Sequence, residues 1–237
     1  SLNEKLVSKI SSEVIYEKFG NFDQSTWSRL STKSLSLLRL FCLLLVAISY
    51  TLVIYNQGGL VPAQFFGSLE FYSFHFALLS LAFAERSATT SSPTVSKRKR
   101  ALIISEIATS ANTSVVAMYF FVFPMIIGPE YSSIIDVFNS VAILLSFLAM
   151  MLHLGLTKFA LLEQDLYWVG AFYVLWLLVN FFFPLQGISY GFVKTIKEYE
   201  QYLIALLFVL ANMAFYILLA KLSQLVKKMK EKHYKRD

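Results

Sequence analysis

The chain has 237 residues, of which 57% are hydrophobic and only 15% are charged. Because a soluble domain carries about a quarter charged residues, this composition excludes an ordinary soluble globular protein. The net charge of +6 favours an anionic partner. The basic residues lie beside the ends of apolar stretches, where attraction to anionic lipid explains them better than nucleic acid does.

The first predicted element is a short amphipathic helix within residues 1–34. Leu2, Leu6, Ile10 and Val14 recur at helical spacing, and lysines occupy the other faces. This pattern is typical of a helix that lies on a membrane surface, and docking against a partner protein is the alternative.

Six apolar stretches follow, and each is about long enough to cross the ~30 Å hydrocarbon core of a bilayer as a helix. Lipid offers no partners for backbone polar groups, so each stretch has to be helical. The expected spans are residues 35–55, 65–84, 101–125, 132–156, 166–183 and 202–222. The sequence therefore predicts an all-α, polytopic membrane bundle of six transmembrane helices, which forms the domain 35–222.

The basic residues are distributed unequally between the two sides of this alternation. Of the 21 Lys and Arg, 19 fall on the side that carries the N-terminal segment, residues 85–100, Lys158 and the tail from Lys221, and only Lys194 and Lys197 fall on the other. Basic bias in short loops sets orientation. Both chain ends are therefore expected in the cytosol, or in the matrix if the membrane is the mitochondrial inner membrane rather than an endomembrane.

The tail, residues 223–237, is predicted to continue the sixth span as a lysine-rich helix. Contact with anionic lipids is the first interpretation of these lysines, and docking to other membrane protein subunits is the second.

Few ionisable or amide side chains fall within the predicted spans, and such groups at membrane depth usually face the protein interior. The candidates are Glu70, Ser73 and His75 in the second span, Asp136 and Asn139 in the fourth, and Asn180 in the fifth. Because the second and fourth spans both enter from the outer side, a rise of about 1.5 Å per residue places Ser73 near the depth of Asp136. A convergent ligand-binding patch is one interpretation, and interhelical hydrogen bonding is the other.

Two further polar features are predicted to be structural. Residues 109–114 are expected to form a close-packing face of small side chains, and His153 is expected to reach the inner interface. No metal-ligand cluster, phosphate loop or nucleophile elbow occurs in the sequence, so we expect no cofactor and no metal. The single Cys42 has no partner for an intrachain disulfide.

Several segments in order carry a resemblance to a known family. They are Trp27-Ser28-Arg29 before the first span, Glu70-Phe71-Tyr72-Ser73-Phe74 in the second, residues 111–124 ending in Pro, Asp136-Val137-Phe138-Asn139-Ser140 opening the fourth, and Tyr173-Val174-Leu175-Trp176 followed by Gly187-Ile188-Ser189-Tyr190. In this order and spacing the chain resembles the androgen-induced-gene and rolling-stone family of six-helix membrane proteins. The resemblance implies hydrolysis of fatty-acid esters of hydroxy fatty acids within the membrane, with a threonine in the second helix and a histidine in the fourth. Those roles would fall on Ser73 and Asp136, with Asn139 at a further histidine or asparagine position.

The aspartate is a serious departure from that pattern. A hydroxyl nucleophile needs a base that takes its proton near neutral pH, which imidazole does well and an aspartate does only if burial raises its pKa. We therefore expect a non-catalytic integral membrane protein, an accessory or lipid-contacting subunit of a larger complex. The alternatives are an intramembrane esterase with Ser73 as nucleophile and Asp136 as base, and a lipid-binding or sensing protein that uses Glu70, His75, Asn139 and Asn180.

Overall fold

A computed structural model describes residues 14–17, 19–26, 30–56, 68–90, 93–122, 137–182 and 198–234. The helices in these ranges are α2 (Thr32–Asn56), α3 (Leu69–Thr89), α4 (Val95–Ala117), α7 (Val137–Leu156), α8 (Leu166–Phe182) and α10 (Glu198–Tyr234). A π-helical turn, η2 (Met118–Val122), extends α4, and a 3-10 turn, η3 (Glu163–Asp165), precedes α8. The described residues contain only one isolated β-bridge, between Ser25 and Thr157. The all-α prediction is confirmed.

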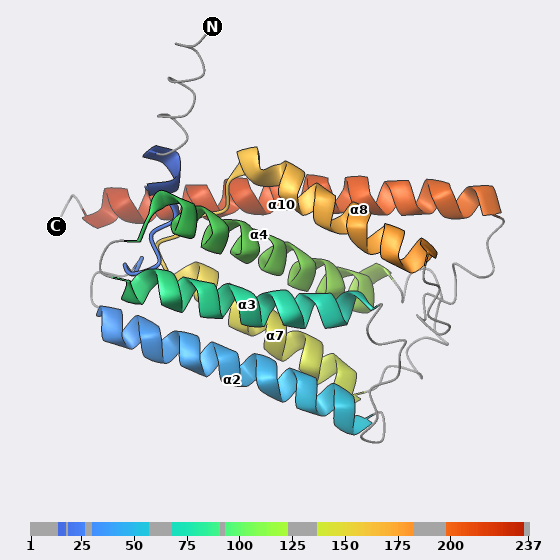
Figure 1. The fold of residues 1–237 in the computed structure, drawn as a ribbon, viewed down its shortest axis with the longest axis horizontal. Helices are drawn as coiled ribbons and strands as arrows, with labels where there is room; N and C mark the ends of the chain where they lie inside the picture. Colours follow the sequence, from blue (N-terminus) through green and yellow to red (C-terminus); the bar gives the residue numbers. More distant parts are fainter. Residues whose placement is uncertain are drawn as a thin grey trace, which may run out of the picture.

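The helices lie roughly side by side along the long axis of the molecule (Figure 1). Helix α4 packs against α3, α7 and α8, while α2 packs against α7 and α3. Helix α8 packs against α10, so that the α8–α10 pair flanks one side of a unit formed by α2, α3, α4 and α7. This arrangement makes α4 the central helix, and every residue from 105 to 115 is buried. The prediction of a close-packing face at residues 109–114 is confirmed.

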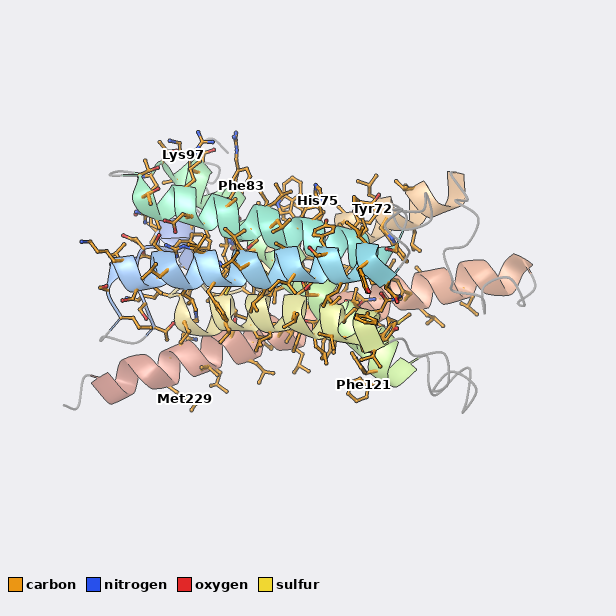
Figure 2. The ribbon with its side chains drawn as sticks, turned by 90° about the horizontal axis from the view of Figure 1, so that it is seen from below. Tyr72, His75, Phe83, Lys97, Phe121 and Met229 are labelled. Atoms are coloured by element: carbon orange, nitrogen blue, oxygen red, sulfur yellow. The ribbon has the colours of Figure 1, made fainter. Side chains whose placement is uncertain are left out.

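The bundle exposes apolar side chains and buries small polar ones. Leu40, Leu44 and Ile48 of α2 are exposed, as are Leu210 and Met229 of α10. Figure 2 shows Met229 and Phe121 projecting away from the helices. The buried polar side chains of the helices include Ser49, Ser73, Ser80, Ser105, Thr109, Ser110, Asn112, Ser114, Ser146 and Asn212. An apolar outside and a polar inside suit a bundle surrounded by lipid.

Four helices in the described part of the chain are long and apolar enough to cross a membrane. They cover Thr32–Asn56, Val95–Phe121, Val137–Leu156 and Leu206–Met229. Length and composition therefore identify the chain as a multi-pass membrane protein. At 1.5 Å per residue, the 37 residues of α10 extend about 55 Å, well beyond the ~30 Å hydrocarbon core.

Exposed and half-buried cations gather at one end of the bundle, which we call the basic end. It carries Lys33 at the start of α2, Arg86 near the end of α3, Lys97 at the start of α4, Lys158 after α7 and Lys228 near the end of α10. Figure 2 shows Lys97 and Met229 at this same end. The other end includes the last turn of α2 and the first turns of α3 and α7.

The chain segment before α2 packs into the basic end. Tyr16 and Phe22 are buried, and the backbone of residues 24–26 pairs with the chain after α7 through the Thr26 N–H to Leu156 carbonyl bond (3.0 Å) and the Lys158 N–H to Gln24 carbonyl bond (2.8 Å). The described part of this segment is therefore integral to the bundle. The predicted amphipathic helix itself lies largely outside the described residues.

Candidate functional site

Ser73 lies on the inward face of α3, where it takes part in contacts between helices. Its side chain is fully buried, and its hydroxyl donates to the Glu70 carbonyl of the same helix at 2.8 Å. The Ser73 carbonyl accepts a hydrogen bond from Asn112 Nδ2 at 3.0 Å, and Asn112 Oδ1 accepts one from the Ser146 hydroxyl at 2.6 Å. Asn112 therefore ties α3, α4 and α7 together at the level of Ser73.

This network changes the depth expected for the fourth span. Ser146, rather than Asn139, lies level with Ser73, because both contact the single side chain of Asn112. Asn139 precedes Ser146 by two helical turns, or about 10 Å at 1.5 Å per residue. Asn139 therefore lies closer to the start of α7 than the level of Ser73, whereas Asp136, which was expected near the depth of Ser73, lies outside the described residues. Helix α3 begins at Leu69, after the Ser68 N-cap, and Ser73 lies only four residues further along. The first turn of α3 is therefore closer to the level of Ser73 and Ser146 than the first described turn of α7 is.

Glu70 and His75 point to different surroundings. Glu70 lies in the first turn of α3, where the helix dipole favours a negative charge. Its carboxyl group interacts with Ser68 and with its own backbone N–H. His75 is exposed. Its Nδ1 lies 3.0 Å from the Tyr50 hydroxyl, and its ring lies 5.3 Å from that of Phe71. Figure 2 shows His75 on the outer surface of the bundle, so it does not face the buried Ser73.

The remaining predicted site residues are described only in part. Asn139 lies in the first turn of α7, and its Oδ1 is buried without a hydrogen-bond partner among the described residues. Asn180 belongs to α8, but its side chain is outside the described set, and Asp136 lies wholly outside it. In the described part of the chain, the Ser73 hydroxyl therefore contacts a backbone carbonyl and no side-chain base.

A second polar network joins α4 to the α8–α10 pair. The Tyr173 hydroxyl of α8 lies 3.0 Å from the Ser110 hydroxyl and 2.5 Å from the Ser114 hydroxyl. Ser114 in turn donates to Asn212 Oδ1 of α10. Because Ser110 and Ser114 are one turn apart, they form a polar seam along α4, the kind of hydrogen bonding that holds helices together in lipid.

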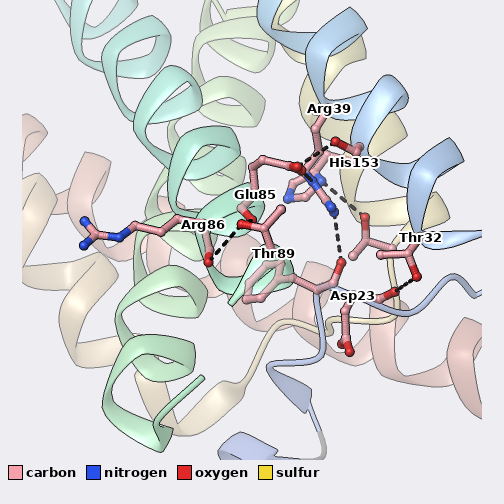
Figure 3. Close-up of polar contacts among 10 residues, drawn as sticks. Asp23, Thr32, Arg39, Glu85, Arg86, Thr89 and His153 are labelled. Atoms are coloured by element: carbon pink, nitrogen blue, oxygen red, sulfur yellow. Dashed lines mark hydrogen bonds and ion pairs between the residues drawn. The ribbon is translucent and has the colours of Figure 1, made fainter. Parts of the chain in front are cut away.

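The strongest electrostatic contact in the described residues lies at the basic end (Figure 3). Arg39 of α2 is buried, and its Nε lies 2.5 Å from Glu85 Oε2 of α3. Its Nη1 donates to the Phe22 carbonyl at 2.9 Å, whereas its Nη2 has no partner among the described residues. Ser36 donates to the other Glu85 oxygen at 2.6 Å. Arg39 thus connects α2, α3 and the N-terminal segment.

His153 lies beside this ion pair (Figure 3). It is fully buried in a cluster with the rings of Phe22 and Phe159, at centroid distances of 6.1 and 4.9 Å, and its Nδ1 lies 3.3 Å from the Thr157 hydroxyl. The prediction that His153 reaches the interface is wrong, because the N-terminal segment folds over it and supplies the aromatic cover.

Lys227 caps the C-terminal end of α7. Its ammonium group donates to the carbonyls of Leu154 (3.0 Å), Thr157 and Phe159. A cation at a helix C-terminus compensates carbonyls that have no partner within the helix. Together with Ser223 and Gln224, which bond the backbone of Leu161, Lys227 shows that the first turns beyond residue 222 pack onto the bundle.

Comparison with protein-family models, with curated proteins and with solved structures finds no match to this chain. Within the described ranges, no three His, Cys, Asp or Glu side chains gather in a way that could hold a metal ion.

Proposed function

We propose that this protein is a non-catalytic, six-span membrane protein with both chain ends on one side of the membrane, and that it serves as an accessory or lipid-contacting subunit of a larger membrane assembly. Helices α3 and α8 supply the two spans beyond the four long apolar ones. The gathering of Lys33, Lys97 and Lys158 at the basic end supports the orientation, since basic flanks face the cytosol or matrix.

One observation carries the non-catalytic half of this proposal. The Ser73 hydroxyl, the proposed nucleophile of the esterase alternative, is fully buried and donates its proton to the carbonyl one turn earlier in its own helix. This is a common way for a serine in a membrane helix to satisfy its hydroxyl. A nucleophile would instead face a side-chain base within hydrogen-bonding distance.

Ser73→Ala is therefore expected to be nearly silent. The free energy of unfolding should fall by less than about 1 kcal/mol, since the lost bond is local to one helix. A serine-directed fluorophosphonate probe should not label the wild-type protein at Ser73. Labelling that disappears in Ser73→Ala would restore the esterase and contradict the proposal.

Asn112→Ala is the informative companion variant. It removes the amide that bridges Ser73 and Ser146, so two hydrogen bonds between helices are lost and their buried partners remain. We expect about 1–2 kcal/mol of destabilisation, towards the upper part of the range for such bonds in membranes. Equal melting curves for Asn112→Ala and Ser73→Ala would show that the bridge does not hold these helices together.

The assembly half of the proposal is tested by extraction in mild detergent. Light scattering after size-exclusion chromatography should find the protein in a particle of defined stoichiometry that contains other membrane subunits. A monodisperse monomer with no stoichiometric partner, obtained from membranes at native abundance, would overturn the subunit assignment.

A further inference from the structure

The connection between α7 and α8 passes through the interior of the bundle as extended chain. Residues 159–162, which we call the buried loop, are all buried. Side chains and backbone from elsewhere satisfy its polar groups. The Ala160 N–H donates to the Phe19 carbonyl (3.2 Å), the Leu162 N–H to Glu106 Oε1 (2.7 Å), and the Tyr216 hydroxyl donates to the Leu162 carbonyl (2.9 Å). Buried non-helical backbone is tolerated only when its polar groups are bonded in this way.

Two buried carboxyl groups meet beside this loop. Glu106 of α4 and Asp165 of η3 are both fully buried, and both bond to Leu162, whose carbonyl accepts a hydrogen bond from the Asp165 N–H at 3.1 Å. Each carboxyl group interacts electrostatically with the other. Glu106 Oε1 accepts from the Leu162 N–H, and Asp165 Oδ1 accepts from the Tyr16 hydroxyl at 2.7 Å. The remaining oxygens, Glu106 Oε2 and Asp165 Oδ2, are buried and have no donor among the described residues.

Little positive charge compensates this pair. From the N-terminal segment, Tyr16 faces Asp165. The ammonium group of Lys99 in α4 interacts electrostatically with Asp165, and the Lys99 Nζ lies 4.9 Å from the centre of the Tyr16 ring. Tyr216 of α10, whose hydroxyl donates to the Leu162 carbonyl and also interacts with Glu106, and Tyr167 of α8 are the other titratable groups nearby, and neither is positively charged. One ammonium group can balance one carboxylate but not two, and two adjacent buried carboxylates repel each other strongly.

We propose that Glu106 and Asp165 form a proton-binding site, in which one proton shared by the two carboxyl groups locks the N-terminal segment and the buried loop onto the bundle. The proton supplies the donor that Oε2 and Oδ2 otherwise lack and leaves a single negative charge opposite Lys99. When it passes to solvent, two carboxylates remain and repel each other. Tyr16 and Leu162, each bonded to one of them, are then pushed apart.

The direction of the pH effect follows from Asp165. Burial raises the pKa of its carboxyl group above the usual range. A carboxyl group with a raised pKa favours the folded state while it is protonated, so this contribution is complete at acidic pH and is lost as the pH rises through the raised value. The basic end should therefore loosen on alkalinisation, the opposite of what an ion-paired carboxylate would cause.

Infrared difference spectroscopy of the full chain in lipid nanodiscs tests the proton directly. At neutral pH we expect the absorption band of a protonated carboxylic acid that disappears on alkaline titration. Glu106→Gln, which retains an acceptor for Leu162, should abolish it, and Asp165→Asn should shift or abolish it. The exposed neighbour Glu163 provides the control, and Glu163→Gln should leave the band unchanged. A wild-type spectrum without the band, or one that Glu106→Gln leaves unchanged, would overturn the proposal.

Hydrogen exchange tests the structural consequence. We compare the exchange rate of residues 19–26 in the wild type with the rate in Glu106→Gln at the same pH. The ratio of the two rates should rise about tenfold as the pH increases, because a tenfold change corresponds to one pH unit of proton linkage. The ratio cancels the intrinsic pH dependence of exchange. A ratio that stays constant across the titration of the infrared band would show that the proton does not control docking.

Discussion

Replacing Arg39 with methionine is expected to lower the free energy of unfolding by about 2 kcal/mol, because Arg39 is buried and its removal leaves the half-buried carboxylate of Glu85 without its cation. Arg39 is about 1% exposed, and its loss would break contacts with Glu85 and with the Phe22 carbonyl at once. The measurement is a reversible denaturation in mixed micelles.

Two variants sharpen this test. Lys33→Met removes an exposed cation from the first turn of the same helix and should change stability by less than about 0.5 kcal/mol. The double variant Arg39→Met/Glu85→Gln should recover part of the loss, since no unpaired carboxylate remains. If Arg39→Met were as stable as Lys33→Met, the ion pair would not stabilise the packing of the basic end.

Replacing Phe22 with alanine is the second large change. The ring packs against both His153 and Phe159, and truncation of a buried phenylalanine costs about 3–5 kcal/mol. Because Phe22 belongs to the N-terminal segment, we expect that segment to undock while the helices remain folded. Exchange of the amide of Thr26, which bonds Leu156, should accelerate by about 100-fold or more, since each 1.4 kcal/mol is tenfold.

The control for Phe22→Ala is Val14→Ala. Val14 lies in the same segment but is 57% exposed, so its truncation should leave the exchange rates nearly unchanged. Equal protection of Thr26 in Phe22→Ala and Val14→Ala would show that the aromatic stack does not anchor the segment.

The sequence predicted the helices well because lipid leaves the backbone no other choice. Each expected apolar stretch contains a helix, from α2 to α10. The ends of the helices were harder to predict, because a helix can continue through polar residues beyond its apolar stretch. Helix α4 begins at Val95, within the basic run before its apolar stretch, and not at the expected residue 101. The predicted continuation of the last helix beyond residue 222 is confirmed, since α10 runs to Tyr234.

The site was harder to predict because its contacts join residues far apart in the sequence. Glu106 was visible as a polar residue within a span, but its partner Asp165 lies in a connection and Tyr216 in the last helix. Arg39 entered the prediction only as one of the basic residues that set the orientation of the bundle in the membrane. The signal available was its position inside the first span, where an arginine needs a partner. The burial of His153 depends on Phe22, which no periodicity places there.

The central claim is that the bundle crosses a membrane six times with both chain ends on one side. Single cysteines introduced into a Cys42→Ala background at Lys33, Ser96, Lys228 and Tyr55 test it, using a membrane-impermeant maleimide on sealed, oriented vesicles. We expect the first three positions to react from the same side and Tyr55, at the far end of α2, to react from the opposite side. Reaction of Lys33→Cys and Lys228→Cys from opposite sides would contradict it.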